Sequence, residues 1–177
     1  QLRLLILCLS RGHVCAWLWP LLRVVVMIRE AKFGDEHNGL IDCLATLSSP
    51  VIGNHRDSGV AGQIDRMLQR GKRTFVCVHN GGVIGTASLM IELKITHDFG
   101  SVAHIEDVAV LAAYQRKGVG HQLIEHCLEV AREAGCYKVI LDCSEANVSF
   151  YEDCGFRRHE VAMRLDLLPQ AKEGVAE

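Results

Sequence analysis

Short segments in which apolar residues alternate with polar ones, or run together, predict β-strands. The β-branched runs at residues 25–30 and 74–78 each fit one strand, and residues 83–95 fit a long returning strand. Asn80, Gly81 and Gly82 separate the last two segments, and such residues accept the positive φ angles of a tight hairpin turn. Three further strands, of which the middle one is expected to be buried, fit residues 102–111, 137–143 and 160–167.

Other segments repeat their apolar residues every three or four positions, which is the spacing of one face of a helix. The strongest of them is residues 120–134, whose apolar stripe ends at Gly135, a residue suited to stopping a helix. Ser, Pro and Gly at residues 48–53 predict a loop. Weaker helical patterns cover residues 34–47, 61–70 and 147–154.

This order of elements predicts an α+β (mixed α/β) domain whose central sheet is partly antiparallel at its start. Two helices follow the first strand, a hairpin comes next, and the later part of the chain alternates strand, helix and strand. We divide the chain into an apolar extension at residues 1–26, one domain at 27–168 and a polar tail at 169–177.

The extension at residues 1–26 is rich in Leu and contains no acidic residue. Its uncharged run between Arg11 and Arg23 has only 11 residues, whereas a helix needs about 20 to cross a bilayer. We therefore expect it to pack on the domain or on a partner, and we expect no membrane partner. A signal anchor is the alternative.

Composition narrows the classes of function. The 177 residues include 19 Lys and Arg against 21 Asp and Glu, so the formal net charge is −2. This balance argues against nucleic-acid binding, because neutralising phosphates needs a clustered excess of positive charge. Apolar residues make up 49% of the chain and charged residues 23%, which predicts a folded core and excludes disorder as the main state.

Eight cysteines allow three interpretations: a disulfide framework, a metal site or reduced thiols. No two of them have the C-x-x-C spacing of a zinc knuckle or redox site. Several lie in periodic apolar segments, where a free cysteine behaves as a small hydrophobic residue. We expect reduced thiols, no metal and an intracellular, cytoplasmic protein, with an organelle left open.

The first chemical signal lies between a predicted strand and the strongest helix, at Gln115, Arg116, Lys117, Gly118, Val119 and Gly120. Glycines let the backbone approach a ligand closely, and N–H groups at a helix N-terminus bind phosphate groups. The two basic side chains add positive charge, so the run suits a pyrophosphate. A glycine turn without a ligand is the alternative. A P-loop fits poorly, because His121 follows where a Ser or Thr is required.

The residues around this loop resemble the GNAT N-acetyltransferases, and among them the eukaryotic glucosamine-6-phosphate N-acetyltransferases. The general pattern is Q-x-x-G-x-G after a strand, followed by a helix, a strand and N-x-x-x-Y. More specific stretches are H-I-E-D-V-A-V at residues 104–110, G-C-Y-K-V-I-L-D-C at 135–143 and F-Y-E-D-C-G-F at 150–156. The resemblance extends over residues 27–167 and is densest at 94–156.

The resemblance implies a GNAT fold, with a mostly antiparallel central sheet splayed in the middle and flanked by helices, and it implies acetyl-CoA as the cosubstrate. The backbone of Val108, Ala109 and Val110 would pair with the pantetheine arm, and the amides of residues 115–120 would hold the pyrophosphate. Asn147 and Tyr151 are one helical turn apart and would face the same way. The Tyr151 hydroxyl would then stabilise or protonate the departing thiolate. Packing between helix and sheet is the alternative role of Tyr151.

On the acceptor side, the resemblance implies residues that bind a phosphorylated amino sugar. The segment that contacts the substrate in the family is matched here by Lys94, Ile95, Thr96 and His97. Glu106 and Asp107 match substrate-side acids, although neighbours in a strand face opposite sides and one of them could be solvated. Asp142 matches an acid at a strand end.

Three positions on the acceptor side match the family less closely. Ser49 stands where the family has Thr, and it keeps the hydroxyl. The phosphate would be bound by Arg164, with Arg158 as the alternative, although a simple alignment places Asp166 there. The proton of the amine would pass to Glu106, to a water or to a backbone carbonyl near Asp142.

The implied reaction is a direct transfer of the acetyl group to the 2-amino group of glucosamine 6-phosphate. The product, N-acetylglucosamine 6-phosphate, leads to UDP-N-acetylglucosamine. A backbone N–H near Val108 would stabilise the oxyanion. The resemblance also implies a homodimer in which the C-terminal strands of the two chains meet. Two alternatives stay open, namely a GNAT acetyltransferase for another small amine or a protein, and a CoA-binding regulatory module without catalysis.

Overall fold

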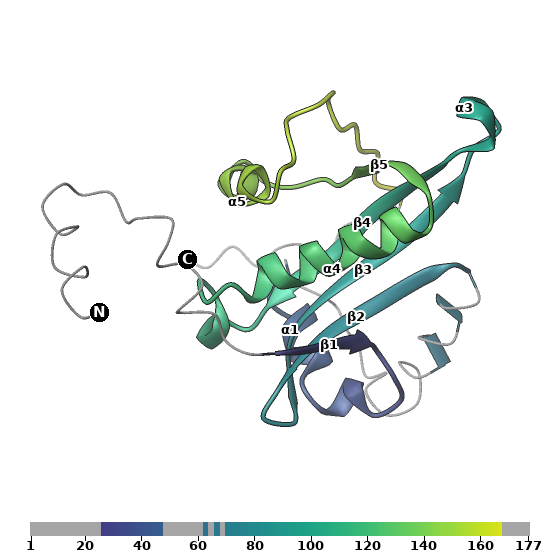
Figure 1. Ribbon diagram of the computed structural model, residues 1–177. Helices are drawn as coiled ribbons and strands as arrows, with labels where there is room; N and C mark the ends of the chain where they lie inside the picture. Colours follow the sequence, from purple (N-terminus) through teal and green to yellow (C-terminus); the bar gives the residue numbers. More distant parts are fainter. Residues whose placement is uncertain (1–25, 48–61, 64–65, 68–69, 168–177) are drawn as a thin grey trace, which may run out of the picture. The chain divides into compact units, whose positions relative to one another are not determined.

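A computed structural model describes residues 26–47, 62–63, 66–67 and 70–167 of the chain (Figure 1). These residues belong to two compact units that divide after Leu141, and each unit is described by itself. The predicted extension at 1–26 (except its last residue), loop at 48–53, most of the helix at 61–70 and the tail at 169–177 lie outside the described residues. None of the helices in the described ranges has the length and apolar character needed to cross a membrane.

Five strands form a single sheet in the larger unit, and they lie side by side in the order of the chain. They are β1 (Met27–Glu30), β2 (Lys72–His79), β3 (Gly82–Leu93), β4 (Ser101–Val110) and β5 (Cys136–Ile140). The first three pairings are antiparallel, and β4 pairs with β5 in parallel. The mostly antiparallel α+β sheet expected from the sequence is therefore confirmed (Figure 1).

The hairpin between β2 and β3 turns at the predicted residues. Asn80 has a φ of 49° and Gly81 a φ of 82°, the positive angles of a two-residue turn that matches the twist of its strands. The register places His79 opposite Gly82. From this turn β3 runs for 12 residues and forms the centre of the sheet, between β2 and β4.

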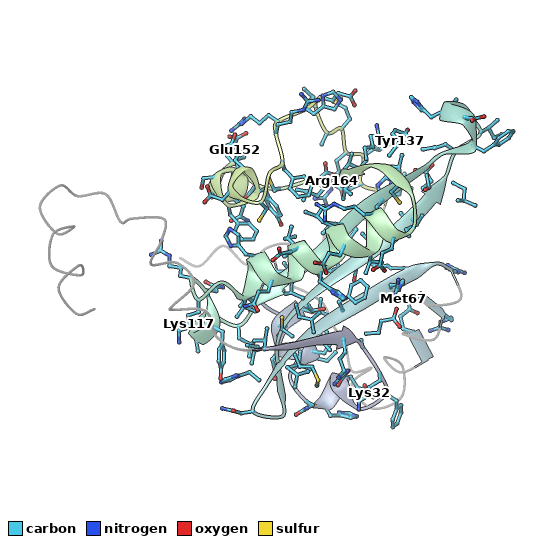
Figure 2. The ribbon with its side chains drawn as sticks, viewed as in Figure 1. Lys32, Met67, Lys117, Tyr137, Glu152 and Arg164 are labelled. Atoms are coloured by element: carbon cyan, nitrogen blue, oxygen red, sulfur yellow. The ribbon has the colours of Figure 1, made fainter. Side chains whose placement is uncertain are left out.

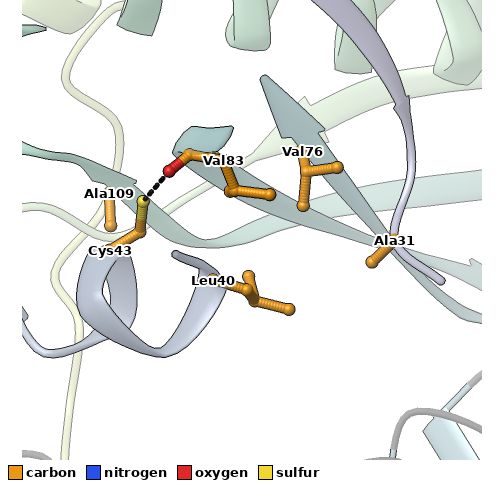
Figure 3. Close-up of a cluster of buried hydrophobic side chains, with 6 residues drawn as sticks. All are labelled: Ala31, Leu40, Cys43, Val76, Val83 and Ala109. Atoms are coloured by element: carbon orange, nitrogen blue, oxygen red, sulfur yellow. Dashed lines mark hydrogen bonds between the residues drawn. The ribbon is translucent and has the colours of Figure 1, made fainter. Parts of the chain in front are cut away.

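Two helices cover opposite faces of the sheet, namely α1 (Leu40–Leu44) and α4 (Val119–Glu133). On the α4 face, Phe75 packs edge-on against His126, with ring centroids 4.6 Å apart. The next strand residue, Val76, points to the other face because successive side chains alternate. There it joins a buried cluster, drawn in Figure 3, with Ala31, Leu40, Cys43, Val83 and Ala109.

Helix α4 confirms the strongest helical prediction. It ends just before Gly135, which has a φ of 72°. Burying a Leu or Ile side chain contributes about 1.5–3 kcal/mol, so the apolar stripe fixes the helix, and the loop before it, against the sheet. The buried residues of that stripe are Val119, Leu123, Ile124, Cys127, Val130 and Ala131.

The helix expected at residues 34–47 is interrupted and forms two short pieces, η2 (Asp35–His37) and α1. Gly39 lies between them with a φ of 106°, and a Cβ there would lie 2.4 Å from the carbonyl oxygen of Val83. The chain therefore passes too close to β3 for a side chain, and this contact breaks the helical path.

A buried ion pair anchors η2 to the end of β1. Asp35 is 2% exposed, and its two carboxylate oxygens each lie 2.7 Å from an Arg29 guanidinium nitrogen. The backbone N–H of Lys32 also donates to Asp35, at 2.8 Å. Burial opposes the charged form of Asp35, but the hydrogen bonds from Arg29 and Lys32 outweigh it and lower the pKa of this carboxyl.

Two expectations about strands are wrong. Strand β5 was expected to be buried, but its residues Tyr137 and Lys138 are exposed. It is the last strand of the sheet, so within the described ranges only β4 pairs with it. The strand expected at residues 160–167 does not form, and that segment has no regular secondary structure. Alternating apolar residues do not make a strand without a neighbour that supplies backbone hydrogen bonds.

The smaller unit contains η4 (Glu145–Asn147) and α5 (Val148–Asp153), which together correspond to the short helix expected at residues 147–154. Gly155 follows with a φ of 91°. Beyond it, the apolar side chains of the extended segment are between 82% and 91% exposed, at Val161, Met163, Leu165 and Leu167.

Candidate active site

Strand β4 changes its pairing half way along its length. It pairs with β5 only from Ser101 to His104, whereas its pairing with β3 continues as far as Val110. In the part of the chain that the structure describes, the edge of residues 105–110 on the β5 side therefore has no strand partner. This open half contains the residues expected to pair with pantetheine, which are Val108, Ala109 and Val110. An open strand edge offers backbone N–H and C=O groups to an extended ligand.

The predicted pyrophosphate loop leads directly from this open half to α4. After η3 (Ala112–Tyr114), the side-chain amide of Gln115 donates to the carbonyl oxygen of Val110 at 3.0 Å. Arg116 and Gly118 have φ angles of 59° and 79°. These left-handed conformations turn the chain from the end of β4 into the helix.

The N-terminus of α4 is the helix end that the sequence predicts to bind an anion. Gly118 is the N-cap residue, and no side-chain hydrogen bond caps this helix end among the described residues. The N–H groups of Val119 and Gly120 belong to this turn, where the helix dipole favours negative charge. Lys117 lies at the same end (Figure 2), with its Nζ 5.5 Å from the centre of the Tyr114 ring.

The predicted substrate-side acids, Glu106 and Asp107, lie at a β-bulge. Thr86 pairs with Ala109, and Ser88 pairs with Glu106. Asp107 and the residue after it therefore face a single residue of β3. Asp107 has a φ of 52°, a conformation that costs a non-glycine residue about 1–2 kcal/mol.

The bulge brings both acids to the same face of the sheet. Lys72 Nζ lies 2.7 Å from Asp107 Oδ2, and Lys72 shares its face with Thr74, two residues further along β2. The hydroxyl of Thr74 is hydrogen-bonded to that of Ser88 at 3.1 Å. Ser88 lies opposite Glu106, so Glu106 is on this face as well. Glu106 and Asp107 therefore do not point to opposite faces, as neighbouring strand residues normally do.

A second polar group lies further along the same face. Lys94 forms an ion pair with Glu92, and His104 Nε2 lies 3.1 Å from Glu92 Oε2. The hydrogen bonds from Lys94 and then His104 lower the pKa of Glu92. His104 precedes Glu106 by two residues in β4, so both side chains lie on one side of the strand.

The segment Lys94 to His97 forms the tip between β3 and β4. The short element α3 (Thr96–Phe99) contains three successive left-handed residues, because His97, Asp98 and Phe99 have φ angles of 53°, 57° and 58°. The His97 ring lies 4.5 Å from the Tyr137 ring of β5. Figure 2 shows Tyr137 near the end of the sheet that is remote from Lys117. Ile95 is 87% exposed.

In the smaller unit, Tyr151 lies in α5 and contacts two aromatic rings. Its ring centroid lies 4.9 Å from that of Phe150 and 6.1 Å from that of Phe156. Burial, followed by the nearby thiols of Cys143 and Cys154, raises the pKa of Tyr151 to about 12. The hydroxyl therefore keeps its proton at neutral pH and is available as a hydrogen-bond donor.

The remaining predicted site residues are exposed or lie outside the described ranges. Asn147 ends η4 and is the N-cap residue of α5. Asp142 follows β5 by two residues and is exposed. Arg164 donates to Asp166 at 2.7 Å and is also exposed. Ser49 lies outside the described residues.

The larger unit therefore offers an open backbone edge next to a helix N-terminus, and a polar face with carboxylates and cations. An extended anionic ligand suits the first, and a hydroxylated, charged acceptor suits the second. Among the described residues, no cluster of three His, Cys, Asp or Glu side chains is placed to hold a metal ion. Four residues of the polar face were not predicted from the sequence, because strand order rather than a motif brings them there: Lys72, Thr74, Ser88 and Glu92.

Comparisons with known proteins agree with these features. The sequence model of the Acetyltransferase (GNAT) family matches residues 40–156. The chain is 53% identical over 87 residues to the glucosamine 6-phosphate N-acetyltransferase of Trypanosoma brucei brucei, a match that covers 49% of this chain and 59% of that protein. It is 34% identical over 140 residues to the glucosamine 6-phosphate N-acetyltransferase of Arabidopsis thaliana, covering 77% of this chain and 93% of that protein.

Two solved structures share the fold and a substantial part of the sequence. The crystal structure of the Arabidopsis thaliana glucosamine-6-phosphate N-acetyltransferase matches with a TM-score of 0.72 and 30% identity, over 81% of this chain and 99% of that one. A Trypanosoma brucei acetyltransferase matches with a TM-score of 0.72 and 40% identity, over 81% of this chain and 100% of that one. The resemblance seen in the sequence is thereby confirmed, and the chain belongs to the Acetyltransferase (GNAT) family.

Proposed function

We propose that this protein transfers the acetyl group of acetyl-CoA to the 2-amino group of glucosamine 6-phosphate. The observation that carries the proposal is the open half of β4, which continues through a glycine loop into the uncapped N-terminus of α4. An extended thioester with an anionic pyrophosphate suits both features together. The choice of acceptor is supported by the relatives in trypanosomes and plants, which act on glucosamine 6-phosphate.

The acetyl-CoA side of the proposal uses mainly backbone atoms. Residues 108–110 would pair with the amides of pantetheine, as an added strand does. The N–H groups of residues 115–120 would hold the pyrophosphate, with charge from Arg116 and Lys117. The left-handed turns at Arg116 and Gly118 support this role, because they direct the chain into the first turn of α4.

The acceptor side uses the polar face of the sheet. Glu106 and Asp107 would accept hydrogen bonds from the sugar hydroxyls and the amino group. The tip formed by residues 94–97 would contact the sugar phosphate region, and Arg164 would neutralise the phosphate. Ser49 would add a hydroxyl. The presence of both acids on one face supports this arrangement.

The reaction itself would be a single displacement at the acetyl carbonyl. The neutral amine attacks the carbonyl carbon, and the N–H of Val108 donates to the oxyanion that forms. The carbon–sulfur bond then breaks and the CoA thiolate leaves, while the nitrogen loses its extra proton through Glu106, water or a carbonyl near Asp142.

Tyr151 would assist departure of the thiolate mainly by hydrogen bonding. Its pKa is about 12, whereas a thiol has a pKa of about 8.5. A complete transfer of the phenolic proton to the thiolate is therefore unfavourable. Tyr151 would donate a hydrogen bond, and the proton released by the amine would balance the charge of the leaving group. Asn147 would help to hold the cofactor near this group.

A homodimer and a cytoplasmic location complete the proposal. The exposed apolar alternation of residues 160–167 supports the dimer, because a second copy would supply the backbone partner that the strand lacks. The buried thiols of Cys43, Cys77 and Cys127 support a reducing compartment. The product would supply UDP-N-acetylglucosamine biosynthesis.

A screen of acceptors tests the proposal directly. We expect the release of free CoA thiol from acetyl-CoA to depend on glucosamine 6-phosphate and to be about 10- to 150-fold faster than with glucosamine, because a charge-assisted hydrogen bond to the phosphate contributes about 1.5–3 kcal/mol. Spermine, a lysine peptide and glucose 6-phosphate are the controls for amine class and for phosphate alone.

The outcomes separate the remaining interpretations. Equal rates with spermine or a lysine peptide would show that the protein is an acetyltransferase but that glucosamine 6-phosphate is not its specific acceptor. Binding of acetyl-CoA without thiol release for any acceptor would favour a regulatory module. Activity with glucosamine equal to that with its phosphate would exclude a phosphate site.

A further inference from the structure

One ion pair spans three strands of the sheet at the predicted acceptor site. Lys72 is the first residue of β2, and Asp107 lies at the bulge of β4, so β3 separates them. The ammonium of Lys72 nevertheless lies 2.7 Å from Asp107 Oδ2. The lysine side chain must therefore extend over β3, along the face that holds Thr74 and Ser88.

The conformation of Asp107 has a cost that a contact from another strand can offset. Its backbone is left-handed, a conformation that glycine adopts readily at bulges and that other residues adopt at a cost. Because the bulge sets the direction of the next peptide, the conformation of Asp107 also sets where the N–H of Val108 points. A charge-assisted hydrogen bond is strong enough to offset such a cost.

We infer that Lys72 is a positioning residue for the acetyl transfer, which it supports by holding the carboxylate of Asp107 and the bulge around it. The inference rests on the proposed function, because it takes the acceptor and the oxyanion to lie at this bulge. Lys72 then acts through Asp107 and does not itself contact the reacting atoms.

The partial burial of the pair supports a positioning role. The side chains of Lys72 and Asp107 are 26% and 39% exposed, whereas those of the neighbouring pair Arg73 and Glu30 are 43% and 45% exposed. Arg73 lies on the opposite face of β2 from Lys72. It therefore provides a matched control: the same strand, a similar ion pair, and no contact with the bulge.

The test measures steady-state kinetics of the full chain with glucosamine 6-phosphate. Lys72→Met is expected to lower kcat/KM for the acceptor about tenfold, since a misplacement of about 1 Å costs up to about 100-fold and the loss of one positioning contact should cause a smaller displacement. The affinity for CoA, measured by calorimetry, should change by less than about twofold because Lys72 is remote from the glycine loop. Lys72→Arg should recover most of the loss, and Arg73→Met should leave kcat/KM unchanged.

A double variant separates positioning from a general loss of stability. If Lys72 acts through Asp107, then Lys72→Met in an Asp107→Asn background should cause almost no further loss. Additive losses, or an unchanged kcat/KM in Lys72→Met, would refute the inference while the wild type remains active. A wild type that does not use glucosamine 6-phosphate refutes the proposed function and, with it, the inference. Thermal melting of each variant shows whether it is folded.

Discussion

Replacing Gly85 by Ala should disturb the predicted cofactor side of the site from the neighbouring strand. Gly85 lies in β3, where a Cβ would come within 3.2 Å of the Ala109 carbonyl oxygen, Leu123 Cδ1 and Val119 Cγ1. Ala109 belongs to the open half of β4, and Val119 begins α4. The added methyl group would therefore press apart the two elements that are proposed to hold acetyl-CoA.

The magnitude follows from three tight contacts without backbone strain. Overpacking a core costs about 1–3 kcal/mol, and the loss of backbone freedom in the unfolded chain returns about 0.4–1 kcal/mol. A net loss of about 1–2 kcal/mol corresponds to a fall in Tm of about 3–6 °C for a chain of this size. If half of that cost falls on the cofactor site, KM for acetyl-CoA should rise about three-fold.

The assay combines thermal melting with KM measured separately for each substrate. KM for glucosamine 6-phosphate should change less than KM for acetyl-CoA. Gly82→Ala is the matched control, because a Cβ at that end of β3 would only come within 3.9 Å of the His79 carbonyl oxygen. A Gly85→Ala protein that melts and binds acetyl-CoA like the wild type would refute the packing argument.

Three further predictions concern single groups. Tyr151→Phe should lower kcat about 100-fold, with KM for acetyl-CoA within about twofold, in a thiol-release assay, because the proposed hydrogen bond to the leaving group would be lost. Burial raises the pKa of Cys43 to about 11 and those of Cys77 and Cys127 to about 12, so at pH 8 these thiols should react with a disulfide reagent only after unfolding. Asp35→Asn should cost about 3 kcal/mol in urea unfolding at pH 7, because Arg29 loses its partner.

Each of these predictions has a clear contrary result. Unchanged turnover would remove Tyr151 from the leaving-group role, and rapid labelling of the three buried thiols in the folded state would contradict their burial. The pKa of Asp35 is lowered in the folded protein, so its contribution is full above the ordinary carboxyl pKa and is lost as the pH falls through the folded value. The difference between wild type and Asp35→Asn should therefore shrink as the pH falls below the ordinary carboxyl pKa of about 3.9. A stability difference that does not change with pH would contradict the lowered pKa of Asp35.

The features that the sequence predicted well depend on neighbouring residues. Asn80 and Gly81 specify a tight turn by their own conformational preferences, and the turn formed there. The apolar stripe of α4 and the stop at Gly135 are also local signals, and the helix differs from the predicted range by one residue at each end. The glycine loop was located because its residues are consecutive.

The features that the sequence did not predict depend on contacts between distant segments. The alternation of apolar and polar residues along a strand cannot show that β4 bulges at Asp107. A bulge is one extra residue in a strand, and it is recognised only from the pairing of β4 with β3. Lys72 is 35 residues away from Asp107 in the chain, and no motif joins them. The strand expected at residues 160–167 has the right alternation but no neighbour among the described residues of its unit.

The open half of β4 has a consequence for the behaviour of the protein without its cosubstrate. An unpaired edge inside a sheet is a template to which another chain can add, and proteins normally cover such edges. On the proposed binding mode the pantetheine arm is that cover, and a ligand that binds only the folded state also stabilises it by mass action. Acetyl-CoA would then protect the protein against aggregation, so that the supply of the acetyl donor would set how much soluble enzyme persists as well as how fast it works.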